Sequence, residues 1–437
     1  MAFPPTSLLP LLLLLLFHAP LSQALLPFRP HALVLPVSKD PATLQYLTQL
    51  NQRTPLVPVK LAVDLGGRFL WVDCDSGYVS SSYLPARCRS LACSLAKSTV
   101  CGDCFAAAPT PGCNNNTCGL FPENPFISTS TSGEAAQDVI SLHSTDGSNV
   151  GPTVQVPRFV FSCAPTFLLE EGFASGAKGL AGLGRTKIAL PSQLAAAFSL
   201  PRKFAICLSS NGVIFFGDEP YVLRPGIDVS KSLIYTPLLT NPVSLAGVSA
   251  DGEPSSEYFI GVKSIKVRGK SIAFDKTLLS INKTDGSGGT KISTSRPYTV
   301  LHSAIFQPLA KEFIRAAEAM NVTQVVATGA FDICFKSENM ASTRVGPAVP
   351  TIDLVLHKKS VVWSIFGANS IERVTKDVSC LAIVDGGADV ITSIVIGGYQ
   401  LENNLVQFNL ADSRVGFSSS LLFRQTTCAN FNFASNA

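Results

Sequence analysis

Charge is scarce in this sequence of 437 residues, and the scarcity excludes several classes of protein. Asp, Glu, Lys and Arg together make up 15% of the chain, well below the about 25% of an average globular protein. A disordered chain and a long charged coiled coil are therefore excluded. The net charge is only +4 and no run of five basic residues occurs, so the sequence does not predict nucleic-acid binding. Its 46% of hydrophobic residues suffices for the cores of two or three folded domains.

Ionisable side chains are also rare at the amino terminus, where His18 is the only one in the first 24 residues. Residues 8–17 form an apolar run broken only by Pro10, and Ser22-Gln23-Ala24 has the small residues of a signal-peptidase site. We interpret residues 1–24 as a signal peptide, because the run is too short for a stable membrane anchor. The mature protein is therefore expected to be secreted and to have no contact with a membrane after cleavage.

Cysteine, in contrast, is abundant, with twelve residues. In an oxidising compartment this even number can form up to six disulfides. Seven of the twelve lie between Cys74 and Cys118, a density that raises zinc binding as an alternative. None of the four histidines of the mature chain lies in that segment, so zinc would need four thiolates in a secreted protein. The sequence favours disulfides, and we expect neither a metal nor a cofactor.

Three Asn-X-Ser/Thr triplets agree with secretion, because this motif is the acceptor for N-linked glycans in secreted proteins. The triplets begin at Asn115, Asn282 and Asn321. Such triplets also arise by chance, so the alternative is an unmodified asparagine at each position. We take these three asparagines as candidate glycosylation sites on the surface of the protein.

Short apolar or alternating runs, separated by Gly, Pro, Asn and Ser, dominate the mature chain. This texture is typical of β-strands joined by turns. Two segments, residues 190–198 and 305–320, instead repeat apolar residues at intervals of three and four. That spacing predicts amphipathic helices. The fold class expected from the pattern is therefore all-β with a few short helices.

A weak internal repeat divides the chain into two halves. Its corresponding segments are residues 63–67 and 179–184 in the first half, and residues 291–295 and 394–398 in the second half. The glycine-rich segment 179–184 lacks the Gly-Lys-Ser/Thr ending of a phosphate-binding loop, so we expect a structural role for it. The repeat predicts two β lobes of similar plan, a disulfide-rich one over residues 25–225 and a second one over residues 226–437.

The repeated segments resemble the pepsin-like aspartic proteinase family over essentially the whole mature chain. The resemblance rests on Val63-Asp64-Leu65-Gly66-Gly67, on the glycine-rich segment and on Ile394-Val395-Ile396-Gly397-Gly398, in this order. Residues 384–387, 400–405 and 427–433 resemble more closely an inactive plant branch, which contains extracellular dermal glycoprotein, basic 7S globulin and the TAXI-type xylanase inhibitors. The resemblance implies a bilobal fold with a cleft between the lobes, and it places the protein in the apoplast or cell wall.

The catalytic pair that the resemblance implies is incomplete. A pepsin-like cleft holds two aspartates that share a proton and activate a water molecule. Asp64 matches the first position, but Ser293 stands at the second, in Ser293-Thr294-Ser295. A hydroxyl group with a very high pKa cannot replace a carboxyl group as acid or base. We therefore expect no catalytic residues, although Asp64 and Ser293 mark the degenerate positions of the dyad.

Further departures from the family pattern agree with an inactive cleft. Leu65 and Gly67 replace hydroxyl-bearing residues that brace the active loops in the family. The flap hairpin, which we place near residues 127–142, contains no tyrosine. We also expect Arg296, three residues after Ser293, to lie near the old dyad and to neutralise Asp64.

The plant branch implies a protein partner, a microbial cell-wall glycoside hydrolase of the xylanase or xyloglucan-endoglucanase type. Such an enzyme has two carboxylates in its cleft, and an arginine on an inhibitory loop can pair with them. Arg344 matches one such loop of the branch, while Arg424 and Gln425 lie at the second, with Gln425 in the aligned place. Two alternatives stay open: a storage or peptide-binding protein of the basic 7S globulin type, and a residual aspartic endopeptidase.

The resemblance also implies part of the disulfide pattern. It pairs Cys334 with Cys380 within the second lobe and Cys207 with Cys428 between the lobes. The pairing of the eight cysteines of the first lobe stays open at this point. A bridge between the lobes would limit their relative motion and would leave a rigid surface for a partner.

Overall fold

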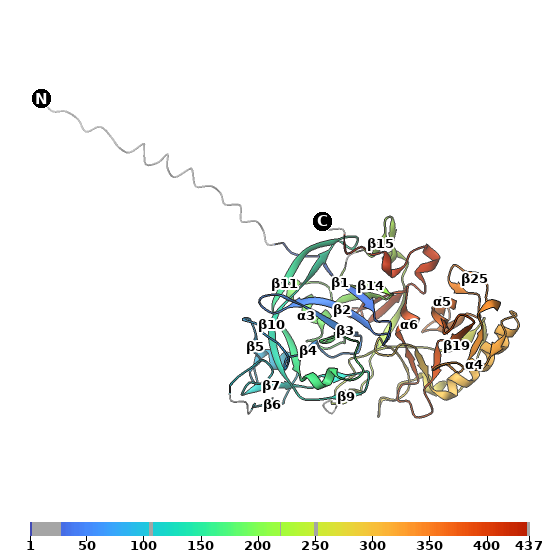
Figure 1. Ribbon diagram of the computed structural model, residues 1–437, viewed down its shortest axis with the longest axis horizontal. Coiled ribbons are helices and arrows are strands. Elements are labelled where there is room, and N and C mark those ends of the chain that lie inside the picture. The colour runs from blue at the N-terminus through green and yellow to red at the C-terminus, as the bar shows by residue number, and fades with distance from the viewer. Residues whose placement is uncertain (2–27, 105–107, 219, 249–251, 435–437) are drawn as a thin grey trace.

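The structure is a computed structural model that describes Met1 and residues 28–104, 108–218, 220–248 and 252–434. Two lobes lie side by side, the first coloured blue to green and the second yellow to red (Figure 1). Apart from Met1, the predicted signal peptide at residues 1–24 lies outside the described residues. No helix among the described residues is long and apolar enough to cross a membrane.

Strands dominate both lobes, as the turn-rich texture of the sequence predicts. The strands that begin before residue 226 are β1 (Ala32–Lys39), β2 (Tyr46–Gln52), β3 (Val57–Asp64), β4 (Trp71–Asp73), β5 (Leu84–Pro85), β6 (Cys101–Gly102), β7 (Thr117–Leu120), β8 (Glu123–Asn124), β9 (Thr129–Ser130), β10 (Gly133–Thr145), β11 (Val150–Ala164), β12 (Gly179–Gly182), β13 (Lys203–Cys207), β14 (Asn211–Gly217) and β15 (Val222–Arg224). The predicted lobe boundary falls in the turn between β15 and the next strand, and it stays a prediction.

The second lobe consists of shorter strands. They are β16 (Ile227–Asp228), β17 (Ile234–Leu239), β18 (Tyr258–Ile260), β19 (Ser264–Val267), β20 (Lys270–Ser271), β21 (Thr290–Ile292), β22 (Thr299–Leu301), β23 (Gln324–Val325), β24 (Cys334–Lys336), β25 (Ser342–Thr343), β26 (Gly346–Pro347), β27 (Ile352–Val355), β28 (Val362–Ile365), β29 (Ile371–Arg373), β30 (Val378–Leu381), β31 (Ile383–Asp385), β32 (Ile394–Ile396), β33 (Leu405–Asn409) and β34 (Arg414–Phe417).

Helices are few and short. The α-helices are α2 (Leu91–Leu95), α3 (Leu190–Phe198), α4 (Ser303–Glu318), α5 (Gly367–Ser370) and α6 (Gly398–Leu401), and the 3-10 helices are η1 (Thr166–Leu169), η2 (Val229–Ser232), η3 (Lys276–Leu279), η4 (Ser337–Asn339), η5 (Leu421–Arg424) and η6 (Cys428–Asn430). The two helices predicted from periodicity are confirmed as α3 and α4. Helix α4 buries Ile305, Leu309 and Phe313, which lie on one face at a spacing of four residues.

The internal repeat corresponds to a repeated arrangement of three strands. In the first lobe, β12 pairs in parallel with β3 and antiparallel with β4. In the second lobe, β32 pairs in parallel with β21 and antiparallel with β22. Asp64 is the last residue of β3, and Ser293 directly follows β21. The two dyad positions therefore lie at equivalent ends of equivalent strands.

The two lobes share one run of antiparallel strands. Its order is β1, β14, β13, β33, β34 and β17, so that the first three strands come from the first lobe and the others from the second. On this sheet the rings of Phe204 and Phe408 stack with centroids 4.8 Å apart, and both side chains are fully buried. The junction between the lobes is thus a packed core rather than a flexible linker.

All twelve cysteines form disulfides, and none of them is free. The two pairs that the resemblance implied, Cys207–Cys428 and Cys334–Cys380, are both formed. The four pairs of the first lobe, which the sequence left open, are Cys74–Cys163, Cys88–Cys101, Cys93–Cys118 and Cys104–Cys113. The cysteine-rich segment is therefore a set of disulfide-linked loops.

The bridge between Cys207 and Cys428 spans 221 residues, whereas that between Cys88 and Cys101 spans 13. A longer closed loop restricts the unfolded chain more strongly, so replacing both Cys207 and Cys428 by alanine should lower the free energy of unfolding by about 5 kcal/mol. Replacing Cys88 and Cys101 in the same way should cost about 3 kcal/mol. Urea unfolding of both variants measures the difference, and an equal loss would contradict the expected dependence on loop length.

Candidate functional site

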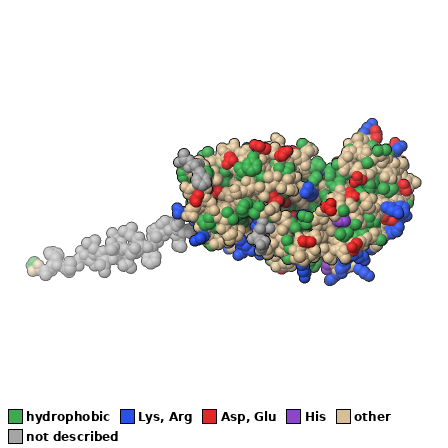
Figure 2. Space-filling model, turned by 90° about the horizontal axis from the view of Figure 1, so that it is seen from below, with side chains coloured by type: hydrophobic (Ala, Val, Ile, Leu, Met, Phe, Trp, Pro, Cys, Tyr) green, Lys and Arg blue, Asp and Glu red, His purple; other side chains and the backbone are tan. Residues whose placement is uncertain are grey.

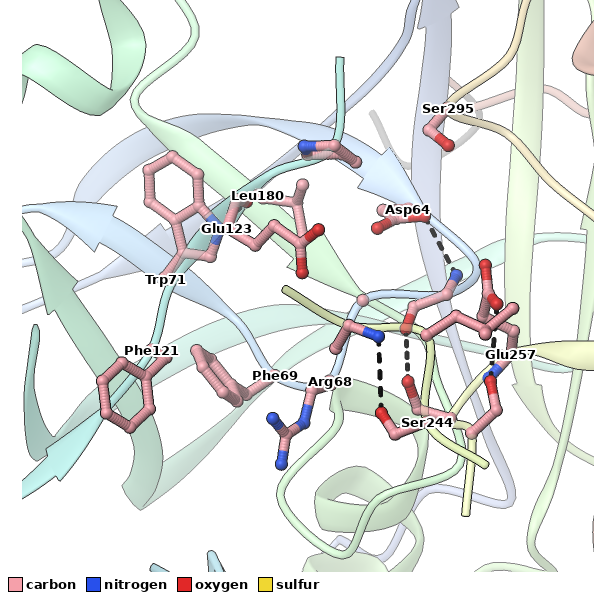
Figure 3. Close-up of a pocket in the computed structure, with 17 residues that line it drawn as sticks. Asp64, Arg68, Phe69, Trp71, Phe121, Glu123, Leu180, Ser244, Glu257 and Ser295 are labelled. Carbon is pink, nitrogen blue, oxygen red and sulfur yellow. Dashed lines mark hydrogen bonds between the residues drawn. The ribbon is translucent and has the colours of Figure 1, made fainter. Parts of the chain in front are cut away.

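Asp64 lies at the floor of the cleft between the lobes. Its side chain is only 8% exposed, and its Oδ1 atom accepts a hydrogen bond of 2.9 Å from the backbone N–H of Gly66. The backbone carbonyl of Asp64 accepts the N–H of Leu183 at 2.8 Å, which fixes the end of β3 against the glycine-rich segment. The carboxyl group faces a cavity of about 90 Å³ (Figure 3).

The second dyad position holds hydroxyl groups. Ser293 is buried, and its Oγ lies 2.9 Å from the Oγ of Ser295. The backbone N–H of Ser295 also donates to the Ser293 Oγ, at 3.2 Å. Ser295 lines the same cavity as Asp64 (Figure 3). The wall that faces Asp64 from the second lobe therefore provides alcohols.

Thr294 joins the two loops, and the sequence reasoning missed it. Its hydroxyl donates to the carbonyl oxygen of Val63 at 2.8 Å and accepts from the N–H of Leu65 at 3.0 Å. Leu65 is the position at which we noted a lost hydroxyl, so the hydroxyl that braces the loops comes from the second lobe. The signal was available, because Thr294 holds the same place in its segment as Leu65 does in the first.

Two further carboxylates line the cavity, Glu123 from β8 and Glu257 from the residue before β18. Glu257 forms an ion pair with Lys291, with the Nζ atom 2.7 Å from Oε1. Among the described residues, no hydrogen bond joins Asp64 to another carboxyl group. In the proteinases, by contrast, two carboxyl groups lie close enough to share a proton.

The pKa of Asp64 is raised from 3.8 to about 7. Burial is the largest cause, and the charges of Glu257 and Glu123 raise it further, while the hydrogen bond from Gly66 and the charge of Lys291 lower it. We expected Arg296 to neutralise Asp64, and this expectation is wrong. Arg296 is exposed and lines a second cavity with Thr43, Phe126 and Pro297, so Lys291 is the cation that acts on Asp64.

The flap hairpin lies earlier in the chain than we predicted. Residues 127–142 are not one hairpin, because Gly133–Thr145 forms the long strand β10. The hairpin over the cavity is formed by β8 and β9, in which Asn124 lies opposite Thr129. The side chain that it directs toward Asp64 is Glu123 (Figure 3).

The candidate contact residues lie on two loops, and both loops contact the segment around helix α5. Arg344 is exposed in the turn between β25 and β26, and the carbonyl of the next residue accepts the N–H of Ala368 in α5 at 2.8 Å. The ring of Phe366, just before α5, packs edge to face on that of Phe423 at 4.9 Å. Phe423 precedes Arg424 and Gln425, which are both exposed. The segment at the start of α5 therefore packs against both loops.

The remaining predictions concern glycosylation and metal binding. Asn115, Asn282 and Asn321 are all exposed, and they stay predicted glycosylation sites. In the part of the chain that the structure describes, no group of three or more His, Cys, Asp or Glu side chains could hold a metal ion.

Comparison with known proteins places this architecture in a family. Family models described as xylanase inhibitor N-terminal and xylanase inhibitor C-terminal match residues 46–218 and 257–419. The probable aspartic proteinase GIP2 of Nicotiana benthamiana is 57% identical over 430 residues, which cover 97% of each chain. This chain belongs to the TAXi family. Among solved structures, the crystal structure of edgp is similar to this chain. The match covers 93% of this chain and 99% of edgp, with 61% identity and a TM-score of 0.92.

More distant TAXi relatives and the proteinases themselves share the fold. The crystal structure of basic 7S globulin from soybean covers 93% of this chain and 100% of its own, with 37% identity and a TM-score of 0.81. The aspartic proteinase from Irpex lacteus covers 92% of this chain and 100% of its own, with a TM-score of 0.55 at 14% identity. The TAXi chain therefore has the pepsin-like bilobal fold, as its sequence predicted.

Replacing Asp64 by asparagine should change how stability depends on pH. The pKa of Asp64 is about 7 in the folded state and about 4 in the unfolded state, so the folded state binds the proton more tightly. This proton binding stabilises the fold fully below about pH 4, and the stabilisation is lost as the pH rises through about 7. Between pH 4 and pH 8 the free energy of unfolding of the native protein should fall by on the order of 4 kcal/mol more than that of the Asp64→Asn variant. Urea unfolding at both pH values tests this, with the exposed Asp389→Asn as control; parallel curves for all three proteins would contradict the buried, raised Asp64.

Proposed function

We propose that this protein is a secreted, catalytically inactive aspartic-proteinase homologue that binds and inhibits a microbial cell-wall glycoside hydrolase of the xylanase or xyloglucan-endoglucanase type. Membership of a family described by xylanase inhibition supports a protein partner. The observation that carries the proposal is the exposed Arg344 at the tip of a short hairpin braced from behind by α5. A role in defence at the apoplast or cell wall follows from this proposal.

The inactive cleft is the first part of the proposal. Water activation in a pepsin-like site needs one ionised and one protonated carboxyl group on either side of the water. Asp64 supplies one such group, whereas Ser293 and Ser295 supply hydroxyls that hydrogen-bond to each other. Loss of one essential member of a catalytic unit costs several orders of magnitude in rate. The cleft geometry therefore supports a binding function rather than hydrolysis.

The second part is the inhibitory contact. A glycosidase cleft depends on two carboxylates, and an arginine can bind a carboxylate through two parallel N–H donors. Arg344 extends from a two-strand hairpin in which the Thr343 hydroxyl donates to the Gly346 carbonyl at 2.6 Å, so little ordering of the loop is needed on binding. Figure 2 shows several Lys and Arg side chains at the outer edge of the second lobe, with Asp and Glu side chains between them.

The compartment is the third part. Six disulfides are formed, and such bridges persist in oxidising compartments. Their density in the first lobe agrees with a protein that acts outside the cell. Similarity to basic 7S globulin favours one further candidate function, a storage or peptide-binding protein, because the whole chain aligns with that globulin in structure.

Replacing Arg344 by alanine should weaken inhibition, because the partner's carboxylates would lose their counter-charge. We expect the inhibition constant to rise by about 30-fold, equivalent to about 2 kcal/mol. The assay titrates the protein against a panel of family 11 and family 12 glycoside hydrolases. The matched control is Arg158→Ala, which removes an exposed arginine from β11 in the first lobe and should leave inhibition unchanged. No inhibition of any enzyme at micromolar concentration would overturn the proposal.

Proteolysis is tested separately. The purified protein should show no pepstatin-sensitive cleavage of an unfolded protein substrate at acidic pH, because the cleft lacks a second carboxyl group in position to share a proton with Asp64. Pepsin in the same assay shows that cleavage is detectable. Cleavage that pepstatin blocks and that the Asp64→Asn variant lacks would instead establish a residual aspartic endopeptidase.

A further inference from the structure

The cavity beside Asp64 has features of a binding pocket that neither hydrolysis nor hydrolase inhibition requires. We call it the acidic pocket and define it by the side chains of Asp64, Arg68, Trp71, Glu123 and Glu257, which all line it (Figure 3). Its volume of about 90 Å³ corresponds to about three water molecules at about 30 Å³ each. It is therefore large enough for one end of a small organic molecule.

The cations of the pocket are already paired. Lys291 forms an ion pair of 2.7 Å with Glu257, and Arg68 forms one of 2.7 Å with Glu253. The Arg68 guanidinium also donates to the carbonyl of Val248 at 2.8 Å. Among the described residues, no ion pair involves either Asp64 or Glu123. The pocket thus has two carboxyl groups more than it has cations.

The buried carboxyl group of Asp64 has an unused oxygen. Oδ1 accepts the N–H of Gly66, but no hydrogen bond to Oδ2 is found among the described residues, although the side chain is more than nine-tenths buried. Glu123 reaches toward Asp64 from the hairpin above, and the backbone N–H of Gly247 is its hydrogen-bond donor (Figure 3). Asp64 Oδ2 opens onto the cavity, so an ammonium group there can donate to it while Oδ1 keeps its bond to Gly66.

The other walls of the pocket are aromatic. Trp71, Phe69 and Phe121 line it, and the indole N–H of Trp71 donates to the backbone carbonyl of Glu123 at 3.1 Å, which positions the tryptophan beneath the hairpin. Aromatic faces attract organic cations, and they also bury the methylene groups next to a charged end. Carboxylates and aromatic rings together are a combination suited to an alkylammonium group.

We propose that the acidic pocket binds an alkylammonium group, with the nitrogen between Asp64 and Glu123 and the alkyl chain against the aromatic wall. The group has three N–H donors, which matches the unused oxygens of the two carboxyl groups. The vacated proteinase cleft is then a receptor for amines or for lysine side chains of a peptide. This activity is independent of the Arg344 hairpin on the second lobe.

Binding of the cation requires ionised carboxylates and so depends on pH. The groups that face the bound nitrogen or lie next to it are Asp64, Glu123, Glu257, Lys291, Arg68 and Glu253. Burial raises the pKa of Asp64 to about 7 and raises that of Glu123 as well. Below about pH 7 a proton on Asp64 competes with the ligand, so affinity should fall by up to about tenfold per pH unit as the pH drops.

Calorimetric titration of the full-length mature protein with butylammonium and with Nα-acetyl-lysine methylamide tests the proposal. We expect saturable binding at pH 8 to at least one of the two probes, weaker binding at pH 6, and none of butanol, which has the alkyl chain but no charge. Binding of both cations indicates that the alkylammonium group suffices. Preference for the lysine derivative identifies a peptide source, and preference for butylammonium a free amine.

Variants locate the binding site. Asp64→Asn and Glu123→Gln should each weaken butylammonium at least tenfold, and Asp64→Asn should also flatten the pH dependence of affinity, which a purely structural role would not do. The matched controls are Asp389→Asn and Glu318→Gln, two exposed acids of the second lobe, and these should bind as the native protein does. Circular dichroism shows whether each variant is folded. If Asp64→Asn does not fold, Glu123→Gln still tests whether the cation binds in the acidic pocket.

Two results would overturn the proposal. One is the lack of saturable binding of either cation by the native protein up to about 10 mM, a concentration at which even an interaction of about 3 kcal/mol is detectable. The other is binding that both pocket variants retain at native strength, because the cation would then lie elsewhere. Inhibition of glycoside hydrolases is measured independently, so failure of one proposal leaves the other standing.

Discussion

The pairing of β13 with β33 is the constraint on which the rest of the molecule depends. These strands belong to different lobes, and Ala205 lies opposite Gln407 in their antiparallel register. The rings of Phe204 and Phe408 stack in the core of this junction, and the Cys207–Cys428 disulfide adds a covalent link. The lobes therefore cannot separate without breaking this sheet.

One threonine organises the floor of the cleft between the lobes. Thr294 reaches from the second lobe to the backbone on both sides of Asp64, so a single hydroxyl aligns the two loops that meet there. A second interlobe contact, in which Lys39 and Tyr46 both donate to Glu402, lies between the first strands and the end of α6. Both contacts join the two lobes through specific hydrogen bonds, and they help to hold the pepsin-like architecture.

The residues around Asp64 set the electrostatics of the cleft. In a proteinase the two carboxyl groups share one proton, whereas here Asp64 faces the hydroxyls of Ser293 and Ser295. The remaining acids, Glu123 and Glu257, come from elements outside the dyad loops. The result is a polar and aromatic pocket in which Asp64 and Glu123 form no ion pair with a described residue, while the exposed Arg344 hairpin lies on a different part of the surface. The two proposals therefore concern two separate parts of the surface.

The sequence by itself determined the two-lobed plan, the positions of α3 and α4, and the chemical identity of the dyad residues, because each depends on local periodicity or on a residue type at one position. Only the tertiary structure decided that Glu123 rather than a residue of 127–142 covers Asp64, and that Lys291 rather than Arg296 acts on it. It also decided the four disulfides of the first lobe. These features are contacts between residues distant in the chain, and their formation depends on how strands pair and loops pack, which no local pattern encodes.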